Sequence, residues 1–334
     1  MNHLLRITVL LIGLIWILAW AAAGRFDDAP EPSDDGSPQP TGETVSPGER
    51  DSARTLRVLI QGEVQEMDMG TYLLGVLRAE MPASFEEEAL KAQAIAARTY
   101  TLYRIRGGGS ANHPNADACD DHTCCKAYLS AEQAAANWGG MAVYYEEKLE
   151  RAVSETDGEV ILYDGAPILA VFFSSAGGST QGAGDVWMND LPYLKKVDSP
   201  EDEALVPNYY STATFSAEEF KSLVQSAYPA ADLSGDVSAW VRDIVRNESD
   251  YVASVTVGGV KMRGNDLRTV LSLRSPSFTV ETSGSTLTFH VTGYGHGVGM
   301  SQYGANALAK EGYSAEEIVQ HYFSGTSVGY DGAA

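Results

Sequence analysis

An apolar run near the N-terminus is the strongest constraint on this chain. Residues 7–23 are apolar apart from Thr8, and 17 residues in a helix extend about 25 Å, enough to cross a bilayer core. The run exceeds a typical signal-peptide core, so we expect an uncleaved anchor over residues 1–24, oriented mainly by Arg6, with the body outside the cytoplasm. A signal peptide cleaved at the small residues 21–24 is the alternative. A buried core helix is disfavoured, because no amphipathic face is visible.

The next segment has the composition of a disordered linker. Residues 25–54 contain five prolines, several Ser and Gly, and an excess of Asp and Glu. No apolar periodicity is present, so this segment cannot bury enough surface to fold. We therefore expect an extended tether over residues 25–54 and a single folded domain over residues 55–328.

The charge balance excludes two classes of partner. The chain has 23 basic and 45 acidic residues, a net charge of −22. Non-specific nucleic-acid binding and adsorption to anionic lipid both need a positive surface. A local basic cleft is still compatible with this net charge. Three cysteines are too few for a disulfide-stapled scaffold.

The patterns along residues 55–328 predict an α+β fold of mixed strands and segregated helices around a substrate groove. Asp68 caps a helix that breaks at Pro82, and Ser84 with Glu87 forms a capping box for a second helix to about residue 104. Further helices are expected around 130–138, from 216, at 301–310 and at 314–323. Strands are expected at 56–60, 142–145, 160–163, 168–174, 251–257, 260–262, 279–282 and 286–291.

One group of charges could form a polar cleft. Glu80 stands at the end of the first helix, and Lys91 and Arg98 share a face of the alanine-rich helix that follows it. A carboxylate with a tuned pKa in such a setting can act as general acid and base. The alternative is that all three are solvated surface charges.

A short insert concentrates metal-binding residue types. All three cysteines and two of the six histidines fall within residues 113–125. This composition favours a tetrahedral zinc site, although the spacing is not that of a standard finger. A disulfide from Cys119 to Cys124 or Cys125 is the alternative in an extracytoplasmic setting, and it would leave one thiol unpaired. Inert thiols are the third possibility.

Two loops carry further candidates. A serine-rich turn at 174–180 lacks the Gly-x-Ser-x-Gly elbow of a serine nucleophile. Alternating glycines at 293–299 let the backbone approach something closely, and they fit neither the dinucleotide fingerprint nor a phosphate loop. His296 lies within this second loop, where a structural role competes with a catalytic one.

Several long motifs resemble one family. The segment GYGHGVGMSQYGANALAKEGYSAEEIVQHYFSGT is similar to the C-terminal signature of the stage II sporulation protein D family. RAEMP followed by KAQAIAARTY resembles its N-terminal signature, FFSSAGGST resembles its central one, and LPYLKKVDSP also fits. The similarity runs in the same order from about residue 56 to residue 326. The predicted anchor and linker resemble the sporulation protein more than soluble relatives.

The resemblance implies a peptidoglycan lytic transglycosylase active in sporulation and engulfment. Such an enzyme cuts between N-acetylmuramic acid and N-acetylglucosamine and leaves a 1,6-anhydro end, preferably on strands stripped of stem peptides. It implies Glu80 as the catalytic acid and base. It also implies substrate contacts from Lys91, Arg98, Tyr193, Lys195, Ser175, His296, Ser301 and Gln302. Tyr193 and Lys195 are expected on one face of a strand.

The resemblance also bears on cofactors and partners. It implies a structural zinc held by His113, Cys119, Cys124 and Cys125, where Cys124 replaces a familiar His and His122 could substitute for one ligand. No nucleotide or redox cofactor is expected. Expected partners are glycan strands, a peptidoglycan amidase and a membrane protein of the engulfment complex. Competing hypotheses are a non-catalytic wall-binding or scaffold module and a zinc-dependent peptidase, which the absence of His-Glu-x-x-His disfavours.

Overall fold

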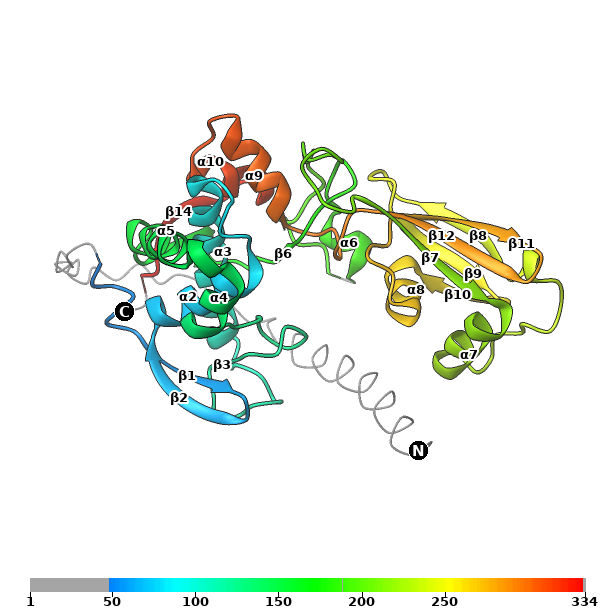
Figure 1. Cartoon of the computed structure of the whole chain (residues 1–334), viewed down its shortest axis with the longest axis horizontal. Coiled ribbons are helices and arrows are strands. Elements are labelled where there is room, and N and C mark those ends of the chain that lie inside the picture. Colours follow the sequence, from blue (N-terminus) through cyan, green and yellow to red (C-terminus); the bar gives the residue numbers. More distant parts are fainter. Residues whose placement is uncertain (1–47, 188, 333–334) are drawn as a thin grey trace, which may run out of the picture. The chain divides into compact units, whose positions relative to one another are not determined.

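A computed structural model describes residues 48–187 and 189–332. The predicted anchor over residues 1–24 and most of the linker lie outside the described residues. Among the helices that are described, none combines the length and the apolar composition needed to cross a membrane. The described chain is an α+β arrangement of several small sheets and separate helices, as the sequence patterns predict (Figure 1).

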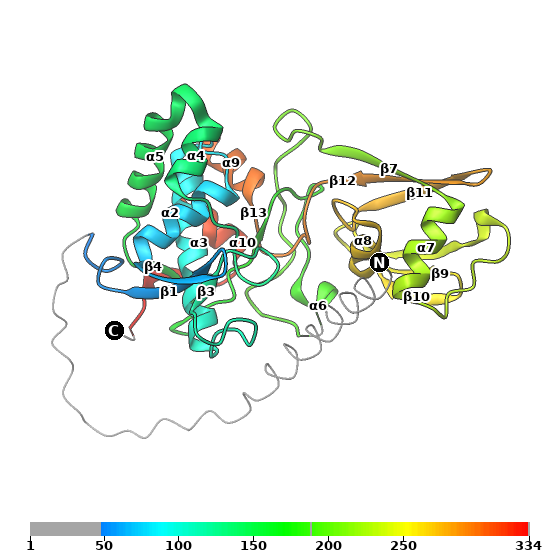
Figure 2. The same cartoon turned by 60° about the horizontal axis from the view of Figure 1, so that its bottom comes forward.

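The larger hydrophobic core is built around one helix, α3 (Glu87–Arg106). Its alanines Ala89, Ala92 and Ala96 are fully buried, and their small side chains let neighbouring helices approach closely. Figure 2 shows α3 among the other helices of this core. These are α2 (Met69–Glu80), α4 (Ala131–Trp138), α5 (Ala142–Glu155), α9 (Gln302–Lys310) and α10 (Ala315–Tyr322), with a 3₁₀ turn at Gly139–Met141.

Three small sheets accompany these helices. The first has the order β2-β1-β3, with β1 and β2 antiparallel and β1 and β3 parallel. The second has the order β14-β4-β5, and in the third β13 pairs in parallel with β6. The bounds are β1 (Thr55–Ile60), β2 (Glu63–Asp68), β3 (Ala118–Cys119), β4 (Glu159–Tyr163), β5 (Ala166–Pro167), β6 (Phe172–Phe173), β13 (Met300–Ser301) and β14 (Ser327–Tyr330), and a short helix α6 spans Ala183–Val186.

A second hydrophobic core forms between residues 217 and 291. It holds two antiparallel three-stranded sheets, β10-β9-β8 and β11-β12-β7, with two helices against them. Sequence patterns predicted both hairpins but not a separate core. The elements are β7 (Tyr210–Ser216), α7 (Ala217–Ala227), a 3₁₀ turn at Val237–Ala239, β8 (Val241–Arg246), β9 (Val252–Val257), β10 (Val260–Arg263), α8 (Gly264–Leu271), β11 (Phe278–Ser283) and β12 (Thr286–Thr292).

The alternating glycines bring two backbone segments into contact. Met300 and Ser301 pair in parallel with β6, and Ser175 forms a bridge to Tyr294. Gly299 has a φ of +80°, and a Cβ there would lie 2.2 Å from the carbonyl oxygen of Val171. The glycines therefore allow a close approach, as predicted, and the partner is the backbone around Val171 and β6 of the same chain.

The folded body begins earlier than the expected boundary at residue 55. Asp157 accepts hydrogen bonds from the backbone N–H groups of Gly48, Arg50 and Asp51 at 3.0, 3.0 and 2.8 Å. Asp51 in turn forms a bidentate ion pair with Arg98, at 2.8 Å to Nε and 2.6 Å to Nη2. The last residues of the predicted linker are thus placed in the body by two carboxylates that composition alone does not distinguish from solvated ones.

Several predicted elements differ from the structure. The strand expected at 168–174 contains only the two residues of β6, Phe172–Phe173. The helix expected from Ser84 begins at Glu87, because residues 82–85 form a turn closed by the N–H of Phe85 and the carbonyl oxygen of Pro82, and Glu86 has a non-helical ψ of 150°. The N–H of Glu86 donates to the Asn306 side chain on α9 at 2.8 Å. The run 142–145, expected as a strand, is the first turn of α5. Buried residues follow at helical spacing in Leu149, Ala152 and Val153, beyond the short window that suggested a strand.

We expect Asp51→Ala to lower the free energy of unfolding by about 3–5 kcal/mol, because it leaves the buried Arg98 guanidinium without its counter-charge. Chemical denaturation of the folded body measures this. A protein beginning at residue 55 should lose stability for the same reason. The double variant Asp51→Leu with Arg98→Met is the control and should recover part of the loss. Equal stability of Asp51→Ala and the parent would contradict the prediction.

Candidate functional site

Glu80 is the last residue of α2 and is partly exposed. The helix ends there because Met81 is extended and Pro82 follows. One oxygen of the Glu80 carboxylate accepts a hydrogen bond of 3.3 Å from the backbone N–H of Ala127. A carboxyl group at the end of a rigid helix, oriented by a backbone donor and still accessible, can exchange protons with a bound molecule.

Lys126, the residue before Ala127, is buried. Its side chain is only 9% exposed, and its ammonium nitrogen lies 3.6 Å from the Phe172 ring centre and 4.2 Å from that of Tyr100. Two aromatic faces therefore hold the charge by cation–π attraction. Burial lowers the pKa of Lys126 to about 8, while the charge of Glu80 raises it. The lysine thus remains mostly protonated at neutral pH.

The charge of Lys126 also acts on His296. Burial, together with the positive charges of Lys126 and Arg268, lowers the pKa of His296 to about 3. Its ring lies 5.5 Å from the Phe173 ring and 6.1 Å from that of Trp187, and its Nδ1 accepts from the N–H of Val298 at 3.1 Å. The imidazole is neutral at physiological pH, which excludes it as a proton donor in the imidazolium form.

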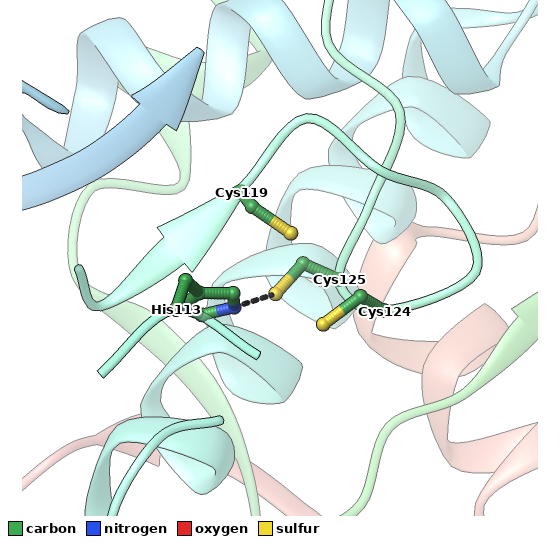
Figure 3. A group of neighbouring side chains, drawn as sticks. All are labelled: His113, Cys119, Cys124 and Cys125. Atoms are coloured by element: carbon green, nitrogen blue, oxygen red, sulfur yellow. Dashed lines mark hydrogen bonds between the residues drawn. The ribbon is translucent and has the colours of Figure 1, made fainter. Parts of the chain in front are cut away.

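A separate cluster of four side chains could hold a metal ion. His113, Cys119, Cys124 and Cys125 point toward one another, and their ligand atoms all lie within 4.8 Å of each other (Figure 3). Cys119 comes from β3, which pairs with β1, and the others come from the loops on either side. The insert therefore converges on a point although its spacing in sequence is irregular.

The donors of this cluster fit zinc. Three sulfurs and one imidazole nitrogen form a four-ligand set typical of structural zinc, in which ligand atoms are about 3.8 Å apart for Zn–S bonds of about 2.3 Å. His113 Nδ1 lies 3.0 Å from the carbonyl oxygen of Ala116, which leaves Nε2 free to face Cys125 at 3.2 Å. Such a second hydrogen bond fixes the ring orientation of metal-binding histidines.

The structure also shows the state of the three thiols and the position of His122. Cys119, Cys124 and Cys125 are all free thiols in the structure, with no disulfide among them. His122 is exposed and does not belong to the four-residue cluster. Four protein ligands leave no open position for a substrate, so such a site suits structural rather than catalytic zinc.

Lys91 and Arg98 share a helix face but bind different carboxylates. Lys91 lies 2.8 Å from Glu88 and 2.6 Å from Glu155. Arg98 is 1% exposed, pairs with Asp51 and donates to the carbonyl oxygen of Glu159 at 3.0 Å. The surface-charge interpretation of Arg98 is wrong, because its guanidinium is buried. Its full set of partners identifies a structural role in the described chain.

Tyr193 and Lys195 are not on a strand. Both lie in an irregular segment, where Tyr193 is 7% exposed and accepts a hydrogen bond from the N–H of Leu169 at 3.2 Å. The side chain of Lys195 is 44% exposed and pairs with Asp190 at 2.8 Å. The expected common face is absent here because no neighbouring strand pairs with residues 191–197 in the described structure.

Ser175, Ser301 and Gln302 are buried. The Ser301 hydroxyl caps α9 by accepting from the N–H of Gly304 at 3.2 Å, and it donates to the carboxylate of Glu201. Glu201 is 3% exposed and also accepts from the N–H of Ala176 at 2.6 Å. The carboxylate of Glu201 therefore braces the C-terminal motif against the central one.

Gln302 and Ser175, two further expected substrate contacts, both lie inside the protein. The amide of Gln302 donates to that of Gln93 on α3 at 3.4 Å. The Ser175 hydroxyl is buried without a hydrogen-bond partner among the described residues. Among the residues expected to contact substrate, His296 is affected by the charge of Lys126. The described structure gives no contact between Glu80 and any of these residues.

Sequence reasoning missed Lys126, Trp187 and Glu201. Lys126 directly follows the cysteine pair, so its only signal was a lysine next to a metal motif, which is not diagnostic.

Two surface hollows of about 310 Å³ each lie elsewhere, one around Trp240 and one around Trp138, and neither includes Glu80. The substrate groove expected at Glu80 therefore stays a prediction.

Comparison with known proteins identifies the family. The family model described as stage II sporulation protein matches residues 61–163. A stage II sporulation protein D from Bacillus amyloliquefaciens is 38% identical over 266 residues, covering 79% of this chain and 75% of that protein. This chain belongs to the stage II sporulation protein D family. The protein of the same name from Bacillus subtilis strain 168 is 37% identical over 268 residues, with coverages of 79% and 75%.

A more distant relative bears a different name. The amidase enhancer of Bacillus subtilis strain 168 is 29% identical over 304 residues, and the alignment covers 77% of this chain and 40% of that protein. A similar segment thus occurs in a protein named for an effect on another enzyme.

We expect the purified protein to contain about one zinc ion per chain, measured by elemental mass spectrometry. Cys119→Ser should lose the metal, and its unfolding temperature should fall, because the β3 segment loses its anchor. His122→Ala is the matched control and should keep both metal and stability. Full metal content in Cys119→Ser would contradict this assignment.

We expect His296 to stay neutral from about pH 8 to about pH 4, because burial and two nearby cations lower its pKa to about 3. Two-dimensional NMR of the imidazole nitrogens tests this, with His296→Gln to assign the signal. A titration midpoint at the ordinary histidine value of about 6.5 would contradict the lowered pKa.

Proposed function

We propose that this protein is a lytic transglycosylase of peptidoglycan. It would cleave between N-acetylmuramic acid and N-acetylglucosamine, preferably in strands without stem peptides, and produce 1,6-anhydro ends during sporulation. The observation that carries this proposal is the Glu80 carboxylate, partly exposed at the end of α2 and held by the Ala127 N–H. Membership of the stage II sporulation protein D family supports a role in sporulation.

In this proposal Glu80 acts in both halves of the reaction. Its protonated carboxyl first donates a proton to the glycosidic oxygen, and the bond from that oxygen to C1 of the muramic residue breaks. The 6-hydroxyl of the same sugar attacks C1, and the Glu80 carboxylate accepts the hydroxyl proton. Because the nucleophile belongs to the substrate, one carboxyl group suffices where most glycosidases need two.

The surroundings of Glu80 suit this use. The Ala127 N–H fixes one carboxylate oxygen, so the group needs little reorganisation between the two proton transfers. Trp187, which is partly exposed, lies near His296, and an aromatic face of this kind can pack against the apolar face of a sugar, whereas Phe173 is buried. Arg98 and Tyr193 would support the fold rather than bind glycan.

Zinc would stabilise the insert in this proposal. His113, Cys119, Cys124 and Cys125 would hold it, and its chemical contribution would be to fix the loop that leads to Lys126 and Ala127. We further propose that residues 1–24 anchor the chain in the cell membrane as a single span, with the catalytic body extracytoplasmic. A peptidoglycan amidase and a membrane protein of the engulfment complex are the proposed partners.

A non-catalytic wall-binding or scaffold module is the second candidate. The relative named amidase enhancer favours it, because that name describes an effect on another enzyme rather than glycan cleavage. The burial of Arg98 and Tyr193 also reduces the number of accessible groups expected to contact glycan. Cleavage assays separate the two candidates.

We expect Glu80→Gln to lower the rate of 1,6-anhydro end formation by about 10²–10⁴-fold, the usual contribution of a general acid and base. The protein would be incubated with glycan strands carrying stem peptides and with strands stripped of them, and the products identified by mass spectrometry. Glu132→Gln, an exposed carboxylate on α4, is the matched control.

Three outcomes would change the proposal. Reducing ends in place of anhydro ends would keep a glycosidase and remove the intramolecular attack. Full activity of Glu80→Gln would remove Glu80 from its role. Binding of glycan without any cleavage would support the scaffold module.

A further inference from the structure

Two helices of the larger core, α4 and α5, have an outer face that no other element of the described chain covers. Of the residues of α4 only Ala134 is buried, and α5 turns its buried residues inward, among them Leu149 and Ala152. Figure 2 shows α5 at the outer edge of the helices around α3, and α4 packs against it. The outer face of this helix pair is therefore accessible to another molecule.

Large apolar side chains are exposed where the two helices join. Met141, Val143 and Tyr144 are 45, 72 and 53% exposed. Single exposed apolar residues are ordinary on a folded protein, but neighbouring ones form a patch of the kind that marks an interaction surface. The patch indicates that a partner covers this end of the helix pair.

The patch continues into a groove between the helices. A hollow of about 310 Å³ extends along α4 from Ala131 to Trp138 and along α5 from Ala142 to Glu150. Its lining is mainly apolar, and the alanines, which include Ala135, would let a partner backbone approach closely. We call this surface the α4–α5 groove. Its volume lies at the lower end of the range of about 300–1,000 Å³ found for binding sites.

The geometry of the groove suits a helical partner. Its lining residues recur every three or four positions, as in Ala131, Ala135 and Trp138 on α4, which is the spacing of the ridges that interlock in helix packing. The backbone groups in the middle of α4 and α5 are bonded within each helix, so an extended peptide would find no strand edge to join. An amphipathic helix can fill such a groove with side chains alone.

Two carboxylates on the groove have no cation beside them. Glu147 and Glu150 line the hollow, and neither forms an ion pair or a hydrogen bond among the residues that the structure describes. A third carboxylate, Glu146, is already neutralised by Arg78, whose Nε donates to it at 3.0 Å. The groove therefore combines an apolar floor with two unpaired negative charges.

The cations of α5 do not neutralise these two charges. Lys148 is buried and donates to the carbonyl oxygen of Phe85, and Arg151 Nε lies 3.4 Å from the Glu87 carboxylate. The unpaired carboxylates are thus complementary to lysine or arginine side chains on a partner. A helix with basic residues on both sides of an apolar stripe matches the floor and the charge of the groove together.

Charge separates this occupant from the competing ones. A second copy of the chain would bring the same carboxylates and a net charge of −22 to the groove. Anionic lipid and glycan strands stripped of stem peptides, whose muramic residues carry carboxylates, are repelled for the same reason. A neutral sugar could stack on Trp138, but it would leave Glu147 and Glu150 without a counter-charge.

We propose that the α4–α5 groove binds a basic amphipathic helix of another protein. Small or aliphatic residues of that helix, repeated every three or four positions, would cover Val143 and fill the hollow. Its flanking lysines or arginines would pair with Glu147 and Glu150. Glu80 is not part of the groove, so the inference does not depend on the proposed cleavage reaction.

The first test measures binding of a synthetic helical peptide of about 18 residues, with alanine and leucine along one stripe and lysine on both sides. A second peptide carries glutamate at every lysine position. Affinities for the full chain are measured by fluorescence anisotropy. The variants are Val143→Asp, which places a charge in the apolar patch, and the double variant Glu147→Lys with Glu150→Lys.

Matched controls change the same residue types away from the groove. Val245→Asp alters an apolar side chain on β8 that is 52% exposed. The double variant Glu248→Lys with Glu311→Lys changes the net charge by the same amount at two other exposed positions. The unfolding temperature of every variant is measured, because all of the substituted side chains are exposed and the fold should be unaffected.

We expect the parent to bind the lysine peptide and not the glutamate peptide. Val143→Asp should weaken binding by about 10- to 100-fold, the range for losing one buried aliphatic side chain. The double variant Glu147→Lys with Glu150→Lys should reverse the preference and bind the glutamate peptide instead. The controls should keep the parent affinity. Equal binding of both peptides by the parent, or equal losses in the variants and their controls, would overturn the inference.

The second test identifies the natural occupant. A photoreactive benzoylphenylalanine replaces Val143 in the full chain, in the cells that produce the protein, and the crosslinked peptides are sequenced by mass spectrometry. We expect a segment of another protein with a basic amphipathic helical pattern, and we expect the crosslink to disappear when Glu147 and Glu150 are changed to lysine. Crosslinks to a second copy, to glycan or to lipid, or no crosslink at all, would overturn the proposal.

Discussion

Close packing around α3 is the constraint on which the rest of this structure depends. The helix is buried on most of its faces, and its alanines allow α2, α5, α9 and α10 to approach it together. One charge of this helix, on Arg98, is buried with it. Arg98 is therefore accommodated only because Asp51, from a segment with a linker-like composition, supplies a bidentate partner.

The same packing brings the three family motifs together. The first motif ends α2 at Glu80 and continues into α3, the central motif forms β6, and the C-terminal motif pairs with β6 through β13 and caps α9 with Ser301. Glu201 bonds both the central and the C-terminal motif, so many of their polar residues hold the backbone rather than face a substrate. The N–H of Ala127 donates to Glu80, and its neighbour Lys126 lies against the Phe172 ring of β6, so the first and central motifs lie close together.

Sequence reasoning succeeded where the signal is local. Caps at Asp68, Ser130, Ser216 and Ser314 set helix starts by hydrogen bonds within four residues, and the Gly258–Gly259 turn needs only positive φ values. It failed in two ways. The short apolar window at 142–145 was too narrow to reveal the helical spacing that continues beyond it. Composition also gave no sign of the distant contact between Asp51 and Arg98, which places the end of the predicted linker in the folded body.

The sequence by itself determined the class of fold, the family and the metal-binding residue types, because these depend on residue identity and short-range order. The tertiary structure decided which charged residues are accessible. Arg98 and Lys91 have the same spacing signal, yet one is buried in an ion pair and the other lies between two carboxylates. Lys126 could not be singled out from the sequence, because its environment depends on the fold. The rings of Tyr100 and Phe172 contact its ammonium group, and the charge of Glu80 raises its pKa. Burial and the choice of partner are long-range properties, and they decide whether a charged side chain is structural or accessible.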